Sequence, residues 1–352
     1  MKNAGRKLYW GFILLIIILL IIVFIFHVKE SIIENFVEEY IDSVTIDLVY
    51  TWVDGNDPKW IKKKSENLGE DPAKLFQDAS PRYYNMDELK YSLRSVHKYA
   101  SWINNIYIVV DDIQAPGFLN LNNPKIKIVK HSEIIDPKYL PLFNSMPIEA
   151  CIHHIQGLSE NFLYSNDDCF FGNYVSKDEI YNKCYWHHPD DKFYTPAEIK
   201  SNDPQWICTV KNGYWLIKET YPKAELIIPA HVAHFCKKSL MYEIEKKYPE
   251  AYEITMNQKT RANDKTNLCG SVCLPKMQCI LGASKGIYKI ISTTSDLYGY
   301  YEMLDNRDVN RLSEIISDKP TKLFCINNAS EYSEEMKKVM ETFYPDPSPY
   351  EI

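Results

Sequence analysis

The alternation of short apolar runs with amphipathic stretches constrains the fold of this chain more than any other feature of its sequence. Runs rich in Ile, Val and Tyr predict buried strands, each bounded by acids or turn residues. Between them, Asp87–Ala100 carries Leu89, Leu93 and Val96 at helical spacing. Strands that alternate with helices favour a mostly parallel sheet with helices on both faces. The predicted strands are Ile46–Val53, Asn105–Asp112, Lys125–His131 and one that opens at Phe162–Tyr164.

Acidic side chains stand where three of these predicted strands end. Asp54 follows the first strand, Asp111 lies at the end of the second, and Asp168 follows the fourth. Because ligands of parallel sheets bind beyond the carboxyl ends of the strands, the three acids predict a cation or phosphate-sugar site at one edge. Strand alternation predicts that Asn166 and Asp168 share a face while Asp167 points away. An ordinary polar turn at these positions is the alternative.

A helix is predicted at Pro147–Leu158, directly before the fourth strand. Ser145 suits its N-cap and Pro147 suits its first turn. Glu149 and His153 are four residues apart, which places them on one face of such a helix. An acid and an imidazole one turn apart can share a proton, bind a metal or form a structural pair, and the spacing leaves these alternatives open.

The N-terminal residues predict a membrane anchor. Leu8–Val28 is almost wholly apolar and long enough to span a bilayer, and no small-residue cleavage site of a signal peptide follows it. Cations precede the span and acids follow it, so the N-terminus is expected in the cytosol. The sequence thus predicts a cytosolic tip and anchor at 1–28, an acidic stem at 29–45 and a catalytic domain at 46–352. Residues 176–228 are expected to be an irregular insertion or lid.

Charge and cysteine content exclude one class of partner and leave another question open. The net charge of -7 gives no support for binding nucleic acid. Nine cysteines are an odd number, so at least one would stay free in an oxidising compartment. Cys269, Cys273 and Cys279 lie close together, but their spacing is not that of a zinc motif. Disulfides or buried thiols are the expected states.

Four long blocks of the chain resemble the Stealth family of sugar-phosphate transferases. This family includes capsular polysaccharide phosphotransferases and the catalytic region of the GlcNAc-1-phosphotransferase alpha/beta subunit. The resemblance implies a Rossmann-like, GT-A-like fold whose helical C-terminal part completes the active site. The blocks are IDLVYTWVDGNDPKW at Ile46–Trp60, the nearly unbroken stretch Arg82–Gly172 that contains FLYSNDDCFFG, Pro229–Arg261, and Leu323–Glu351.

The resemblance also implies a reaction. A hydroxyl of a glycan acceptor would attack the phosphorus that bears the sugar in a nucleotide-diphosphate sugar, such as UDP-GlcNAc or a similar UDP-hexose. UMP would leave and a phosphodiester would form. Since nucleotide sugars are available in the Golgi lumen, the expected location is the Golgi membrane, with a single-pass type II topology and a lumenal catalytic domain. A bacterial inner membrane is the alternative.

Site residues follow from matching positions in the blocks. His231 is expected to be the general base, with His234 as its rival, and Arg261 is expected to clamp phosphate. A hard cation, Mg²⁺ or Mn²⁺, would neutralise the phosphate charge. The implied catalytic residues are Glu149, Asp168, His231 and Arg261; the implied metal ligands are Asp168 and Asn327; the implied donor contacts are Trp52, Asp54, Arg82, Asp87, Asn144 and Ser145.

Two departures from the family pattern keep other functions open. The fourth block usually contains Cys-x-Asn-Asp, whereas this chain has Asn328 in place of the acid, which removes one negative charge from the expected cation site. The third block has Ala233 where a Pro is usual. A metal-dependent glycosyltransferase of GT-A type and a non-catalytic sugar-binding homologue are the alternatives, because fold does not decide chemistry.

Overall fold

The computed structural model describes two compact units, which meet in sequence between Val44 and Thr45. The described residues are 20, 22–25, 27–29, 34–69, 87–186, 198–199, 205–260, 270–292, 301–304, 321–326 and 334–352. In the first unit, residues 34–43 are helical, as expected for the stem. Within the part of the chain that is described, no helix is both long and apolar enough to cross a bilayer, and most of Leu8–Val28 lies outside that part.

The second unit is built on a five-stranded sheet in the order β3-β2-β1-β4-β7. The first four strands in that order are parallel to one another, and β7 pairs with β4 antiparallel at the edge. The mostly parallel sheet predicted from the sequence is therefore confirmed. Its strands are β1 (Ile46–Thr51), β2 (Ile106–Val110), β3 (Ile126–Lys130), β4 (Asn161–Asn166) and β7 (His234–Lys237).

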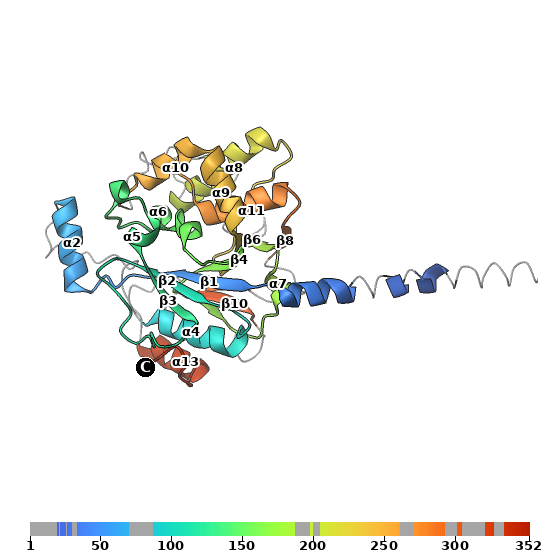
Figure 1. The fold of residues 1–352 in the computed structure, drawn as a ribbon, viewed down its shortest axis with the longest axis horizontal. Coiled ribbons are helices and arrows are strands. Elements are labelled where there is room, and N and C mark those ends of the chain that lie inside the picture. The colour runs from blue at the N-terminus through green and yellow to red at the C-terminus, as the bar shows by residue number, and fades with distance from the viewer. Residues whose placement is uncertain are drawn as a thin grey trace, which may run out of the picture. The chain divides into compact units, whose positions relative to one another are not determined.

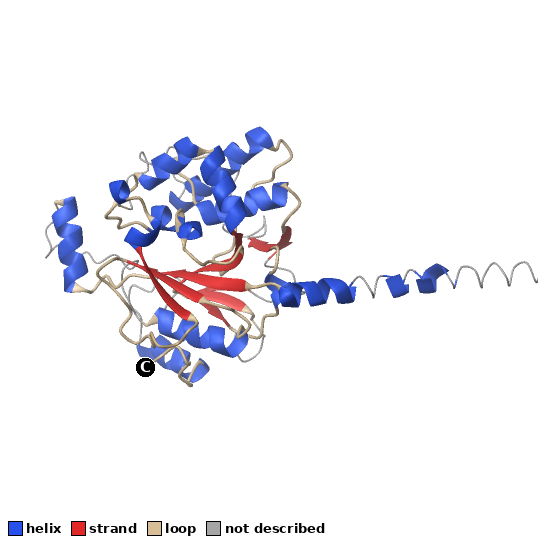
Figure 2. Ribbon diagram, viewed as in Figure 1, coloured by secondary structure: helices blue, strands red, loops and turns tan. Residues whose placement is uncertain are grey.

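Helices cover both faces of this sheet (Figures 1 and 2). One face carries α4 (Glu88–Tyr99) and α13 (Glu334–Phe343), and most of the remaining helices lie on the other, whereas α2 (Pro58–Leu68) stands to one side. The other helices are α5 (His131–Ile134), α6 (Ser145–Glu149), α7 (Lys177–Ile180), α8 (Gln205–Thr220), α9 (Lys238–Lys247), α10 (Pro249–Met256), α11 (Leu274–Ser284) and the 3-10 turns η2 (Pro137–Tyr139) and η3 (Ile152–His154).

Two small sheets extend the unit. One has the order β5-β10-β9, from β5 (Cys169–Phe171), β10 (Leu323–Ile326) and β9 (Tyr301–Leu304), and the other pairs β6 (Lys183–Trp186) with β8 (Lys289–Ser292). In the first of them, β10 joins α13 and α4 through a buried aromatic cluster, in which the rings of Phe170 and Phe324 stack with centroids 5.1 Å apart. The C-terminal tail is fixed by Arg94 on α4, whose guanidinium holds Glu351 at 2.7 Å.

Two predictions about local structure are wrong. The helix expected at Pro147–Leu158 ends at Glu149 and is followed by η3, and its N-cap is Asn144 rather than Ser145, because the Asn144 side chain accepts the Met146 N–H. The stretch 176–228 is not irregular where it is described, since it includes α7, β6 and the 16-residue α8. The role of this stretch as an insertion or lid stays a prediction.

The cysteines described are buried free thiols. They are eight of the nine in the chain, and Cys269 lies outside the described residues. Of the two states that the sequence left open, the structure therefore shows the buried thiol at these eight positions.

Candidate active site

The sheet order brings the carboxyl ends of β1 and β4 together. The chain leaves β1 toward β2 and β3, then returns to place β4 on the other side of β1. Such a reversal opens a crevice at the carboxyl ends of the two central strands. Trp52 and Asp54 follow β1 at this edge, and Asp167 and Asp168 follow β4. The edge at which the acids were predicted is thus the one where the strand order reverses, between β1 and β4, which is the switch point of the sheet.

Asp168 contacts His231 at this edge. The antiparallel pairing of β7 with β4 sets His234 opposite Tyr164, so the residues just before β7 run alongside the end of β4. His231 Nε2 lies 3.4 Å from Asp168 Oδ1, and both side chains are partly exposed, at 31% and 21%. Of the two candidate histidines, His231 is therefore the one that the structure shows beside Asp168.

The two groups shift each other's pKa in opposite directions. Burial disfavours the imidazolium of His231, but Asp168 and Cys169 together outweigh burial and raise the pKa of His231 to about 10. Burial alone would raise the pKa of Asp168, yet His231 and neighbouring thiols lower it below its usual value. At neutral pH the pair is thus an imidazolium beside a carboxylate.

Asp167 adds a second carboxylate to the same turn. Residues 167 and 168 form the turn between β4 and β5, so the strand alternation on which the predicted shared face of Asn166 and Asp168 rested does not reach Asp168. Burial and the charges of Glu88 and Asp168 raise the pKa of Asp167 well above its usual value. Like charges gathered in a partly buried turn form an electrostatic setting that a divalent cation would relieve.

Two thiols, which the sequence analysis did not connect with the site, complete this cluster. Cys169 Sγ donates to Asp168 Oδ1 at 3.6 Å, and Cys325 lies opposite Cys169 in the pairing of β5 with β10. The ligand atoms of Asp168, Cys169, His231 and Cys325 all lie within 4.8 Å of one another. The position of Cys169 directly after Asp168 could have indicated that its thiol lies at the site. Nothing in the sequence predicted the pairing of β5 with β10, which brings Cys325 there.

Glu149 lies in a different setting from the one predicted. Glu149 is 8% exposed and its carboxylate accepts the Cys273 thiol at 3.4 Å, and burial together with Glu149 raises the pKa of Tyr164 of β4. Because α6 ends at Glu149, His153 does not share a helical face with it, and His153 instead contacts Glu245 of α9 at 2.7 Å. Glu149 thus reaches β4 through Tyr164, two positions before the end of that strand.

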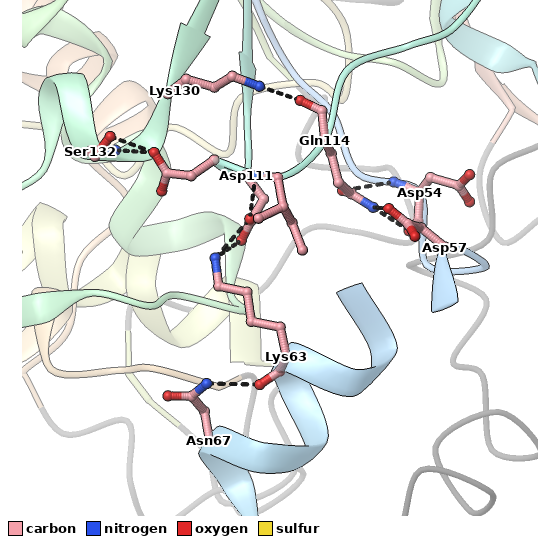
Figure 3. A network of polar contacts seen from close by, with 10 residues as sticks. Asp54, Asp57, Lys63, Asn67, Asp111, Gln114, Lys130 and Ser132 are labelled. Carbon is pink, nitrogen blue, oxygen red and sulfur yellow. Dashed lines mark hydrogen bonds and ion pairs between the residues drawn. The ribbon is translucent and has the colours of Figure 1, made fainter. Parts of the chain in front are cut away.

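The rim beyond β1 and β2 is a closed polar network, shown in Figure 3. The buried Gln114 amide donates to the Asp54 carbonyl at 2.7 Å and accepts the Asp54 N–H at 3.3 Å. Lys63 of α2 holds both oxygens of Asp111, at 2.7 and 2.8 Å. This ion pair gives Asp111 a structural role. The Asp54 carboxylate instead accepts the Asn56 N–H at 2.9 Å, and Asp168 contacts His231. Trp52, which precedes the network, is only 8% exposed.

Asn144 has a structural task that links two of the blocks. Its amide donates to the carbonyls of Gln258 and Thr260, at 3.0 and 3.4 Å, while the neighbouring Phe143 N–H donates to Lys259 at 2.8 Å. These bonds fix the backbone that leads directly to position 261. Ser145, the first residue of α6, is partly buried beside Asn144.

Asp87 precedes α4 with a left-handed backbone (φ 63°) and lies 3.8 Å from Lys337 of α13. It is followed by Glu88, the residue whose charge acts on Asp167. Three predicted site residues, Arg82, Arg261 and Asn327, lie outside the described residues, as does Asn328.

The sequence matches family models for three conserved regions of Stealth proteins. Region 1 covers residues 44–71, region 2 covers 82–188 and region 3 covers 230–268. Region 2 contains Asp168 and region 3 contains His231, so the contact between them joins two of the regions. This chain belongs to the Stealth family. The fourth block of this Stealth protein, Leu323–Glu351, stays a resemblance noted in the sequence.

Curated relatives of this Stealth protein bear the names of phosphotransferases. An exopolysaccharide phosphotransferase of Streptomyces coelicolor is 33% identical over 317 residues, which are 87% of this chain and 57% of the relative. A second one from the same organism is 32% identical over 320 residues, 87% of this chain and 52% of the relative. The capsular polysaccharide phosphotransferase SacB of Neisseria meningitidis serogroup A is 29% identical over 325 residues, which are 87% of this chain and 57% of the relative. The chain spans little more than half the length of these relatives.

Proposed function

We propose that this Stealth protein transfers a sugar 1-phosphate from a nucleotide-diphosphate sugar, UDP-GlcNAc or a similar UDP-hexose, to a hydroxyl of a glycan acceptor. A bond forms between the acceptor oxygen and the phosphorus that bears the sugar, and the bond from this phosphorus to the oxygen of UMP breaks. The contact of Asp168 with His231 at the switch point of the sheet carries the proposal. The phosphotransferase names of the relatives support it.

His231 is the proposed proton carrier of the reaction. Its partly exposed ring stands at the crevice, and its proton is held by the charge of Asp168, which raises the pKa to about 10. His231 can accept the acceptor's proton only when the charge of Asp168 is engaged elsewhere, because this carboxylate, together with Cys169, raises the pKa of the ring. While protonated, the same ring offers a positive charge to phosphate oxygens.

Asp168 and Asp167 fit the expected divalent cation. Their carboxylates stand in one turn, where burial, followed by the charges of Glu88 and Asp168, raises the pKa of Asp167. Oxygen donors of this kind suit Mg²⁺ or Mn²⁺, which would neutralise diphosphate charge when bound. Asn327 is proposed as a further ligand, and Arg261 as the phosphate clamp whose approach Asn144 fixes through Gln258 and Thr260.

The remaining proposed residues surround the donor. Trp52 and Asp54 follow β1 on the same edge as Asp168, and Asp87 adjoins Glu88. Arg82 and Ser145 complete the proposed donor contacts, and Glu149, linked to β4 by Tyr164, is the proposed second catalytic acid. These proposed groups neutralise charge on the donor and align it with the acceptor, which are the two requirements of phosphoryl transfer.

Product analysis on a panel of donors tests the reaction. The full chain is incubated with labelled UDP-hexoses, glycan acceptors and Mg²⁺ or Mn²⁺, and the products are separated. UMP together with a sugar phosphodiester is the expected result, and Asp168→Asn is expected to abolish it. UDP together with a glycosidic bond would instead identify a GT-A glycosyltransferase. Donor binding without turnover over the whole panel would identify a sugar-binding homologue.

The compartment is part of the same proposal. The cations before Leu8–Val28 and the acids after it favour a type II anchor in the Golgi membrane with residues 46–352 in the lumen. A bacterial inner membrane is the alternative. Protease protection of a C-terminal tag in sealed vesicles checks the orientation, and digestion of the tag from the cytosolic side would contradict it.

A further inference from the structure

Cys169 and Cys325 face each other across an antiparallel strand pair. Their register is direct, with Cys325 opposite Cys169. The hydrogen bonds Ile326 N to Asp168 O and Gly172 N to Lys322 O, both 3.0 Å, belong to the alternate positions of this ladder. The two cysteines therefore occupy a non-hydrogen-bonded pair, where opposing side chains come closest. Both thiols are buried, at 3% and 0% exposure.

The distances around this thiol pair match those between ligands of a tetrahedral cation. Zinc binds oxygen and nitrogen at about 2.0–2.1 Å and sulfur at about 2.3 Å, so two tetrahedral ligand atoms are separated by about 3.3–3.8 Å. His231 Nε2 and Asp168 Oδ1 are 3.4 Å apart, and Asp168 Oδ1 and Cys169 Sγ are 3.6 Å apart. All four ligand atoms, including Cys325 Sγ, lie within 4.8 Å of one another.

We propose that Asp168, Cys169, His231 and Cys325 form a tetrahedral site for zinc or another thiophilic divalent cation, and that this cation inhibits sugar-phosphate transfer. Two sulfurs, one imidazole nitrogen and one carboxylate oxygen are the donors that zinc prefers, whereas Mg²⁺ requires oxygen ligands in near-octahedral geometry. Binding releases one proton from each thiol and one from the His231 imidazolium to the solvent.

The proposal that the cation inhibits transfer rests on the proposed function, whereas the proposal that the four residues bind the cation does not. Asp168 is the shared residue: its Oδ1 faces the thiols and the imidazole, and the neighbouring Asp167 faces Glu88. A thiophilic cation would therefore hold Asp168 and His231, the two groups assigned to phosphoryl transfer, in a fixed geometry. Excess Mg²⁺ would compete for only one of its four ligands.

A second cluster of potential ligands supplies a control. His153 and His154 both direct Nε2 to one oxygen of Glu245, at 2.7 and 2.9 Å. These separations are those of hydrogen bonds and are shorter than the spacing around a tetrahedral cation. His154 is partly exposed and belongs to no proposed catalytic group. His154→Asn thus removes this cluster while leaving the thiol site in place.

Cobalt replaces zinc as a spectroscopic probe in the first experiment. The reduced full chain is titrated with Co²⁺, and thiolate-to-cobalt charge transfer is recorded. One bound ion with a charge-transfer band is expected in the wild type and in His154→Asn. Cys169→Ser and Cys325→Ser are expected to lose the band and to weaken zinc binding by more than about 100-fold, since even lost outer partners cost up to about 100-fold.

X-ray absorption of the zinc-loaded wild type keeps the inference testable if the serine variants do not fold. Two sulfur neighbours at about 2.3 Å and two nitrogen or oxygen neighbours at about 2.0 Å are expected. Sulfur-free coordination, a cobalt band unchanged in Cys169→Ser, or a Cys169–Cys325 disulfide that persists in reductant would each overturn the site.

Activity measurements separate inhibition from binding. If transfer is observed, zinc is expected to inhibit it in excess Mg²⁺, and Cys169→Ser is expected to relieve the inhibition. Inhibition that is equal in Cys169→Ser and wild type would overturn the proposal that the cation inhibits transfer. Absence of transfer with every donor would refute the proposed function, while the cobalt spectrum would still decide the binding site.

Discussion

At the residue scale, the proton on His231 is the feature that most affects the proposed chemistry. The ring is 3.4 Å from Asp168, whereas His234 is a strand residue paired with Tyr164. Replacing His231 by Asn is expected to lower the rate about 100- to 10,000-fold, the usual contribution of a positioned proton carrier. Rates of UMP formation would be compared with those of His234→Asn. An inactive His234→Asn that unfolds like wild type, with an active His231→Asn, would reverse the assignment.

A second prediction at this scale concerns the pH dependence of stability. Burial opposes the charge of His154, but Cys151 and Glu245 raise its pKa to about 10; burial likewise opposes the charge of Glu245, but His153 and His154 lower its pKa to about 2. The raised pKa of His154 stabilises the fold fully below about pH 6.5, and this stabilisation is lost as pH rises through about 10. The lowered pKa of Glu245 stabilises fully above about pH 4.5, and this is lost as pH falls toward about 2.

The expected optimum from this cluster therefore lies between about pH 4.5 and 6.5. The melting temperature should fall by about 2–4 °C between pH 6 and pH 9. Glu245→Gln should reduce this dependence, because the glutamine carries no charge to hold the His154 proton. Differential scanning calorimetry at both pH values measures the effect, with Glu243→Gln on the same helix as control. Equal pH dependence in wild type and Glu245→Gln would contradict the assignment of these pKa values.

At the scale of elements, the packing of β5 against β10 positions the acidic turn and both thiols of the site. Gly172 follows β5, and a methyl group on it would overlap the Thr321 carbonyl and come within 3.3 Å of the Phe324 ring. Gly172→Ala is expected to destabilise the chain by about 1–3 kcal/mol, the usual cost of overpacking. At Gly117 no atom lies within 4 Å of an added Cβ, so Gly117→Ala should stay within about 0.5 kcal/mol of wild type.

Urea unfolding of the two glycine variants gives these differences directly. The cobalt spectrum provides a second readout, because a shift of β10 relative to β5 would separate Cys325 from Cys169. Equal midpoints for the two variants would show that the backbone at Thr321 moves without cost, and that β10 is not held as tightly as its contacts indicate.

The same elements show what the sequence could and could not predict. The central strands β1 and β2 were recognisable as nearly continuous apolar runs and β3 by its alternation, and the order of strands and helices placed the strand-end acids at one edge. Helix α6 was predicted too long, since spacing does not reveal that His153 turns toward Glu245. The β5–β10 pair joins residues more than 150 positions apart, and local patterns carry no information about such a pairing.

At the scale of the whole molecule, Thr45–Ile352 forms a unit with its own core. Its first strand begins at Ile46, and the fully buried Asp47 accepts the Asn105 and Ser159 N–H groups at 3.0 and 2.8 Å. A chain that starts at Thr45 is therefore expected to fold, with a melting temperature within about 2–4 °C of the full chain. A matched chain that starts at Val49 lacks Asp47 and half of β1.

This shorter control chain is expected not to fold, because it lacks half of β1 and because the two partly buried N–H groups would lose their acceptor, at a cost of up to about 1–3 kcal/mol each. Circular dichroism during thermal unfolding, at equal detergent concentration for all three chains, compares them. If the chain from Thr45 also lacked a cooperative transition, the first unit would contribute to the stability of the second. The proposed lumenal domain would then require residues before Thr45 to hold Asp168 and His231 in contact.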